Sequence, residues 1–329
     1  MKQFHFTLIS ILILLSLEAC NKDPKNVSTL TPGYDPVKVE RLDLAITDLP
    51  SSSAQLLDSM KSGLDIYLPV LGFSADSVQS ALPAIYESPL TATFGVEVRD
   101  RFPSADSIEL ELGRISQVLA DTLPTIHLDR VFGVISPYNQ SVIVADSTVL
   151  VALNHYMGSS YEAYSAIPEP LRLLKTPDRI PIDIAEAMIR VNYPFLASDN
   201  PTMLERMLYE GAVATALSTL FPDSGREYIF GLSQDVYMNS VKSIPLTWND
   251  LSSSGLLYST DTKAVSQLFS RLPNPDFPPY SGPILGWHIV KSYVANNPSV
   301  TQTYLLSPDF FQQAQTRLIE AKFDAQSVI

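Results

Sequence analysis

Apolar and polar positions follow a helical period over much of the chain. One stripe, with apolar residues three or four positions apart, consists of Ile108, Leu112, Ile115 and Leu119. This spacing predicts one face of an amphipathic helix. Asp106 and Glu109 have the spacing of a capping box, so we expect this helix to begin at Asp106.

Further helices are expected where capping residues precede an apolar period. Asn200-Pro201 places an N-cap residue before a proline in the first helical position, and Pro222 ends the segment that follows. The remaining expected helices are a stretch from Asp261 to Leu272, one marked by Leu285, Ile289 and Tyr293, and a last one capped by Ser307-Pro308-Asp309.

Strand signals are confined to the middle of the chain. Short β-branched runs are separated there by turn residues such as Tyr138-Asn139-Gln140. The runs are Thr125–Leu128, Val131–Ser136, Val142–Ala145 and Thr148–Leu153. Since helices precede and follow them, we predict an α+β fold: a mostly helical single domain with a small, mainly antiparallel sheet.

The first twenty residues have the features of a secretory signal. Lys2 precedes an apolar run over residues 4–17, and the small Ala19 precedes Cys20, the only cysteine of the chain. The run is too short to span a bilayer as a helix. We therefore expect residues 1–19 to be a signal peptide.

The cleavage region resembles a bacterial lipobox, in which Cys20 is lipidated and becomes the mature N-terminus. Glu18 departs from that pattern, and the alternative is an ordinary secretory signal with an unpaired cysteine. The polar residues that follow lack apolar periodicity, so residues 20–36 are predicted to form a flexible tether. No second such stretch interrupts the remainder, and residues 37–329 are predicted to form one globular domain.

Charge excludes some partners. Removing the signal takes one lysine and one glutamate from totals of 22 basic and 35 acidic residues, so the mature chain keeps a net charge of −13. This balance argues against nucleic acid, which needs clustered lysine and arginine. It also argues against a basic patch for anionic headgroups. Membrane contact is therefore expected only through the N-terminal lipid.

Histidine is too sparse for a helical metal site. Beyond the signal, the chain has only His127, His155 and His288, and no two of them lie one helical turn apart. A Gly-x-Ser-x-Gly elbow and a phosphate-binding glycine loop are also missing from the sequence. We expect no metal and no cofactor, and the sequence assigns no catalytic residue. A triad assembled only by folding stays open.

Several short motifs resemble the GldB-type gliding-motility lipoproteins of Bacteroidetes in their order and spacing. They are Arg41-Leu42-Asp43, Val151–Gly158 followed by Tyr161 and Tyr164, the segment from Asp178 to Tyr193, Met203–Gly211, and Gly286–Tyr293. Two positions differ from the family's usual residues. Asn154 stands where the family usually has aspartate, and Ala212 stands where it has lysine.

The same family distantly resembles predicted zinc proteases that carry a His-Glu-x-x-His helix. The resemblance places Glu186 at the position of the general base and Glu210 at that of the third metal ligand. Both histidine positions are apolar, Ala185 and Ile189. One carboxylate without imidazole partners cannot retain zinc. The resemblance therefore implies a zincin-like domain with a degenerate active site.

Six residues are candidates for the lining of the former cleft: Glu210, Glu186, His155, His288, Tyr209 and Trp287. Three of them have a structural alternative: an ion pair for Glu210, core packing for Trp287, and a surface position for His288. If the Glu210 helix packs on the Gly286–Tyr293 helix, Gly211 and Gly286 are the expected points of close approach.

By resemblance, we expect a lipid-anchored accessory protein of a cell-envelope machine, supporting gliding motility or protein secretion. The lipid implies an outer-membrane lipoprotein facing the periplasm or the cell surface, with other envelope proteins as partners. Two alternatives remain. One is an active envelope hydrolase or peptidase, and the other is a receptor that binds a peptide or glycan in the former catalytic cleft.

Overall fold

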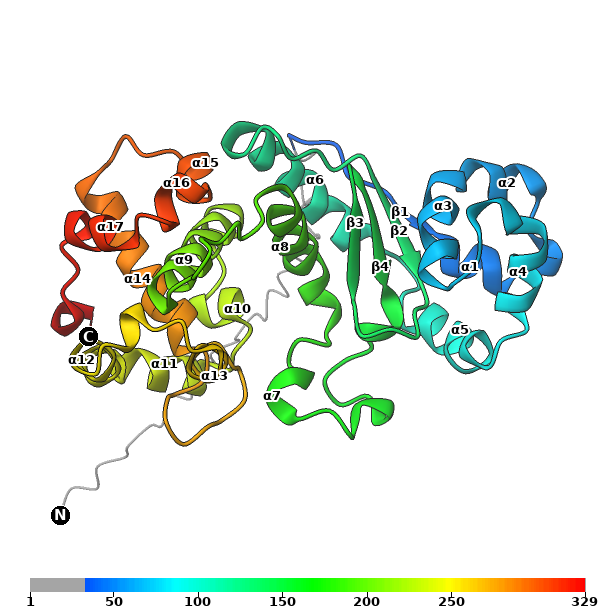
Figure 1. The fold of residues 1–329 in the computed structure, drawn as a ribbon. Helices are drawn as coiled ribbons and strands as arrows, with labels where there is room; N and C mark the ends of the chain where they lie inside the picture. The colour runs from blue at the N-terminus through cyan, green and yellow to red at the C-terminus, as the bar shows by residue number, and fades with distance from the viewer. Residues whose placement is uncertain (1–32, 329) are drawn as a thin grey trace, which may run out of the picture. The chain divides into compact units, whose positions relative to one another are not determined.

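A four-stranded mixed sheet lies among helices in the computed structural model, which describes residues 33–328 (Figure 1). The strand order is β1-β2-β4-β3. The strands are β1 (Val39–Arg41), β2 (Arg130–Val134), β3 (Val142–Ala145) and β4 (Thr148–Ala152). β1 pairs with β2 and β2 with β4 in parallel, whereas β3 and β4 are antiparallel.

The expectation of a mainly antiparallel sheet is therefore wrong, although the α+β class and the small size of the sheet are confirmed. The hairpin of β3 and β4 places β4, and not β3, beside β2. The three-residue β1 joins from far away in the sequence, with Val39 opposite Val131. Residues 125–128 were expected to form a strand, but they form a loop that buries Ile126 and Leu128.

The two faces of the sheet contact different helices. Phe132 and Leu150 point to one side, where they pack with α1 (Leu42–Thr47), α3 (Lys61–Val70) and α4 (Val78–Tyr86). Val131 and Val149 point to the other side and join the larger core, to which α6 (Asp106–Thr122) and α8 (Ile180–Asn192) contribute. This division follows from the alternation of side chains along a strand, and Figure 1 shows helices on both sides of the sheet.

The other helices are distributed before and after the strands. They are α2 (Ala54–Ser59), α5 (Pro89–Arg101), α7 (Glu169–Arg172), α9 (Met203–Leu220), α10 (Arg226–Phe230), α11 (Gln234–Lys242), α12 (Ile244–Ser253), α13 (Thr262–Leu268), α14 (Ser281–Asn296), α15 (Gln302–Leu305), α16 (Pro308–Phe311) and α17 (Ala314–Ala321). Residues from Tyr34 onward form one compact unit.

The predicted helices are present, but their caps differ in detail. α6 buries the expected apolar stripe, yet its N-cap is Ala105 without a side-chain hydrogen bond, so the expected capping box at Asp106 is wrong. α9 does have a capping box, formed by Thr202 and Glu205 and not by Asn200. Thr202 serves because its hydroxyl accepts from the backbone N–H three residues on.

Two further expectations concern the C-terminal half. Asp261 is the N-cap of α13 as predicted, although the helix ends at Leu268. α14 buries the expected Leu285, Ile289 and Tyr293. The Ser307-Pro308-Asp309 segment opens only the short α16, so it does not begin the last helix, which is α17.

α9 and α14 approach each other at glycines, as predicted. A Cβ added to Gly286 would lie 1.8 Å from the carbonyl oxygen of Met207, and one added to Gly211 would lie 2.3 Å from the backbone of Gly286. Both contacts are far shorter than van der Waals separation. Only glycine therefore permits this backbone contact.

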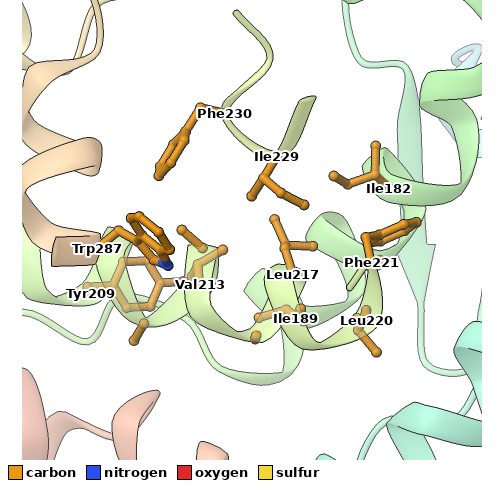
Figure 2. Packing of buried hydrophobic residues seen from close by; sticks show 14 of the residues in the cluster. Ile182, Ile189, Tyr209, Val213, Leu217, Leu220, Phe221, Ile229, Phe230 and Trp287 are labelled. Carbon is orange, nitrogen blue, oxygen red and sulfur yellow. The ribbon is translucent and has the colours of Figure 1, made fainter. Parts of the chain in front are cut away.

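The core beside this contact is continuous from α8 to α14. Figure 2 shows the side chains of α9 turned toward those of α8, α10 and α14. The residues labelled there are Ile182, Ile189, Tyr209, Val213, Leu217, Leu220, Phe221, Ile229, Phe230 and Trp287. All of them are buried, so this cluster fixes α8 relative to α9.

The chain enters the domain along α6. The backbone N–H of Val37 donates to the carbonyl of Glu109 over 3.1 Å, and the N–H of Val39 donates to its carboxylate over 3.0 Å. Lys38 pairs with the same carboxylate at 2.6 Å. A Cβ on Gly113 would lie 2.3 Å from the carbonyl oxygen of Asp35, so the entering backbone lies directly against the helix.

Candidate functional site

A cleft of about 620 Å³ opens between α8, the N-terminal half of α9, α13 and the loop before α14. Its lining combines charged, hydroxyl and apolar side chains. They are Glu186, Arg190, Phe195, Asn200, Pro201, Thr202, Arg206, Glu210, Thr260, Thr262, Val265, Ser266, Phe269, Arg271 and Tyr280. Two of the six candidate residues, Glu186 and Glu210, line this cleft.

Arg190 joins the two carboxylates. Its Nη2 lies 2.8 Å from Oε1 of Glu186 and 2.6 Å from Oε2 of Glu210. Glu186 and Arg190 are one turn apart on α8, which places both side chains on the same face. Glu210 reaches the guanidinium from α9. One cation therefore forms short ion pairs with both acidic candidates.

The pKa shifts of Glu186 and Arg190 agree with this ion pairing. Burial alone would raise the pKa of Glu186, but the positive charges of Arg190 and Arg271 outweigh it, so the pKa is lowered from its ordinary value. Burial would lower the pKa of Arg190, yet the two carboxylates raise it well above its ordinary value. Glu186 and Arg190 are therefore both charged at neutral pH.

The residues at this position do not fit a zinc ion. Ala185 and Ile189, at the two histidine positions, are fully buried and apolar. The space between the two carboxylates is filled by the guanidinium of Arg190. Within residues 33–328 no group of three histidine, cysteine, aspartate or glutamate side chains could hold a metal ion. The side chains of this cleft therefore do not provide the ligand set that a zinc protease requires.

Two more arginines that the sequence interpretation missed line the cleft. The guanidinium of Arg206 lies 4.4 Å from the ring centroid of Phe195. Arg271 donates from Nε to the carbonyl of Phe230 over 3.0 Å and from Nη2 to the hydroxyl of Tyr280 over 2.9 Å. Tyr280 has a left-handed backbone, with φ of 59°, which turns the chain into α14.

A sequence signal existed for two of these arginines. Arg190 follows Glu186 by four residues, and Arg206 precedes Glu210 by four residues. Opposite charges at this spacing on one helix are expected to pair. Arg271 has no comparable signal, because it follows α13 in a proline-rich loop and reaches the cleft only through the tertiary fold.

Tyr209 and Trp287 lie in the core outside the cleft lining. The hydroxyl of Tyr209 donates to the carbonyl of Tyr193 over 2.8 Å, and its ring lies 5.7 Å from the guanidinium carbon of Arg190. The ring of Tyr209 therefore lies beside the guanidinium of Arg190 on the core side. Trp287 packs edge-to-face on Phe230 at a centroid distance of 6.1 Å.

The two candidate histidines also lie outside the cleft lining. Burial, reinforced by Lys291, lowers the pKa of His288 to about 4, and its Nε2 has no hydrogen-bond partner among the described residues. Burial and Lys175 likewise lower the pKa of His155 to about 4. Its Nδ1 lies 3.1 Å from the hydroxyl of Ser141, at the end of the sheet. Both rings are neutral at pH 7.

Asn154 and Ala212, the two positions where the sequence differs from the residues expected for the family, are both buried. Asn154 accepts from the backbone N–H of Ser136 and donates to its carbonyl, both over 2.9 Å. An aspartate could only accept, so asparagine satisfies both groups of this buried backbone. Ala212 is fully buried on α9.

The fold and the cleft define a mostly helical α+β protein in which one arginine pairs with both glutamates of the cleft. Residues 20–324 match the family described as gliding motility protein GldB, and the chain belongs to this family. Searches found no matching curated protein and no matching solved structure. Membership relates the chain to gliding motility and implies a lipoprotein of the cell envelope.

The described part of the chain gives one further fact about the membrane. Among residues 33–328, no helix has the length and apolar character needed to cross a bilayer. Cys20 and the predicted signal peptide lie outside the described residues. The predicted lipid anchor and the predicted domain boundary at residue 37 therefore remain predictions.

Proposed function

We propose that this protein is a lipid-anchored accessory protein of a cell-envelope machine that supports gliding motility or protein secretion. Its anchor is a lipid on Cys20 in the outer membrane, and its partners are other envelope proteins. The observation that carries the proposal is the family match over residues 20–324, which includes Cys20 and nearly the whole domain.

We further propose that the domain is non-catalytic and zincin-like. This part is supported by the position of Arg190, which holds Glu186 and Glu210 in ion pairs at 2.8 and 2.6 Å. A general base must be able to accept a proton from water near the operating pH. Glu186 is unsuited to that role, because Arg190 and Arg271 lower its pKa.

Replacing Cys20 with alanine is expected to move the protein from the membrane fraction to the soluble fraction, or to stall its export. The reason is that lipid chains supply the only membrane contact we propose. Fractionation of the native host followed by immunoblotting measures this. Ser28→Ala, a change within the same polar tether, is the control that should stay with the membrane. Unchanged membrane association of a fully processed Cys20→Ala protein would refute the anchor.

The non-catalytic proposal predicts little bound zinc. The purified protein, incubated with zinc and then desalted, should retain far less than one zinc per chain by elemental mass spectrometry. Arg190 is the reason, because it already fills the space between the two carboxylates. The Glu210→Gln variant should give the same low content. One zinc per chain in the native protein, lost in that variant, would contradict the proposal and favour the hydrolase.

A further inference from the structure

We propose that the cleft binds a carboxylate group of a partner protein through Arg206 and Arg271. The neighbouring apolar side chains of the cleft contact the partner residue next to that carboxylate. This rests on the proposed function as an accessory protein, since it names the chemistry by which a partner is held. The carboxylate belongs either to the chain terminus of the partner or to an acidic side chain.

The cleft carries an excess of positive charge. Three arginines and two glutamates line it, which leaves an excess of one positive charge in a protein whose net charge is −13. Arg190 takes up both glutamates in short ion pairs. Of the other two arginines, Arg206 meets Glu210 only at 3.9 Å, and Arg271 forms no ion pair within 4 Å among residues 33–328.

Arg206 is oriented by an aromatic ring and not by a short ion pair. Its nearest carboxylate oxygen is that of Glu210, 3.9 Å away, which is beyond hydrogen-bond distance. Its guanidinium forms no hydrogen bond with any residue from 33 to 328, and it is held instead against the ring of Phe195 at 4.4 Å. Stacking of this kind orients the planar group while its N–H donors stay available.

Arg271 is held in place by two hydrogen bonds to neutral groups. Nε donates to a backbone carbonyl and Nη2 donates to the hydroxyl of Tyr280, so both partners are uncharged at neutral pH. The pKa of Tyr280 is raised by burial, which keeps that hydroxyl protonated. The side chain lies across the Tyr280 ring at 3.9 Å, so its direction is fixed. Arg271 is therefore a positioned cation whose hydrogen-bond partners among residues 33–328 are all uncharged.

The other residues that line the cleft indicate which groups of the partner lie next to the bound carboxylate. Phe195, Val265 and Phe269 supply an apolar wall, and the hydroxyls of Thr260, Thr262 and Ser266 supply polar contacts. Guanidinium groups pair with carboxylates in a bidentate manner. The volume is that of a small-ligand pocket, so it suits the end of a peptide or one side chain and not a folded surface.

The test uses the full-length protein and a defined probe. Pools of random hexapeptides, one with a free C-terminal carboxylate and one amidated, are passed over immobilised protein, and the retained peptides are quantified by mass spectrometry. Native protein should retain acidic or free-carboxylate peptides at least tenfold more than the Arg206→Gln variant does. Loss of binding on amidation assigns the carboxylate to the chain terminus, whereas retention of aspartate- and glutamate-containing amides assigns it to a side chain.

Arg101→Gln is the matched control, because Arg101 is exposed on α5 and does not line this cleft. That variant should retain peptides as the native protein does. Thermal unfolding of each variant checks that Arg206→Gln is folded, and Arg206→Lys should recover only part of the binding. Equal retention by native protein and Arg206→Gln, absence of retention by both, or displacement by inorganic phosphate alone with no peptide preference would overturn the inference.

The failure of this inference is distinguishable from failure of the proposed function. If the cleft inference fails but the envelope role holds, Arg206→Gln restores gliding to a deletion strain as well as native protein does. If the envelope role itself fails, deletion of the gene leaves gliding and protein secretion unchanged. Both are scored on the same strains by colony spreading and by the proteins released into the medium.

Discussion

Replacing Gly286 with alanine is expected to lower the free energy of unfolding by about 3 kcal/mol, at the upper end of the cost of overpacking. The added methyl carbon would lie 1.8 Å from the carbonyl oxygen of Met207 and 2.6 Å from its carbonyl carbon. These atoms belong to the backbone of α9, so no side-chain rotation relieves the contact. Urea denaturation followed by circular dichroism measures the loss.

The sign of this effect is informative. In an uncrowded helix, alanine is more favourable than glycine by about 1 kcal/mol, so a stabilised Gly286→Ala protein would show that α9 and α14 do not touch here. Gly33→Ala is the control, since nothing lies within 4 Å of its added carbon. It should leave the midpoint of unfolding unchanged.

Replacing Arg190 with methionine is expected to lower the free energy of unfolding by about 2–3 kcal/mol at pH 7.5. Removing one partner of a buried pair leaves an uncompensated charge, and here two carboxylates lose their cation. The value is below the full cost for buried pairs because the Arg190 side chain is 32% exposed. Lys61→Met, at an exposed ion pair with Asp65, should leave the free energy of unfolding nearly unchanged.

The pH dependence separates this explanation from loss of packing. In the native protein the pKa of Glu186 is lowered from 4.5, so its stabilising contribution is complete above pH 4.5 and is lost as the pH falls through the lower folded value. Without Arg190, the burial of Glu186 loses the largest charge that opposes it, so the pKa of Glu186 rises relative to the native protein. The difference between variant and native protein should therefore shrink as the pH falls from 7.5 to 5. A constant difference would contradict the electrostatic explanation.

Local signals account for the helices that the sequence predicted correctly. α6 and α14 follow from the spacing of their own apolar residues, and all of those residues are buried. α13 follows from Asp261, whose side chain accepts a hydrogen bond from the N–H of Lys263. Such features depend on residues within a few positions of each other, which is why one sequence suffices.

The sheet could not be predicted in the same way. β1 contains Glu40 and Arg41 and has no apolar alternation of its own. Its partner β2 is some ninety residues away, with Val39 opposite Val131. The pairing of β2 with β4 likewise depends on which strand of the β3–β4 hairpin packs beside β2. Strand pairing is decided by tertiary packing, which a local pattern does not contain.

Of the residues that line the cleft, only the two glutamates were predicted as site residues from the sequence. Glu186 and Glu210 came from a resemblance to a protease motif, and the structure places both in one cleft. That motif contains no arginine at the position of Arg190, so the resemblance does not point to this residue. Tyr209 and Trp287 were indistinguishable from core residues by sequence, because large aromatic side chains occur in both settings.

The way the chain enters the domain has a mechanical consequence. Any tension on the chain ahead of residue 35 first meets the hydrogen bonds of Val37 and Val39 to Glu109, and then the parallel pairing of β1 with β2. These bonds join the entering segment to α6 and to β2, so the pull is divided between them before it reaches α9, to whose Leu220 carbonyl Arg114 of α6 donates a hydrogen bond. If the chain is tethered as we propose, a moving envelope would load α6 and the sheet first, and the helix that carries Glu210 through them.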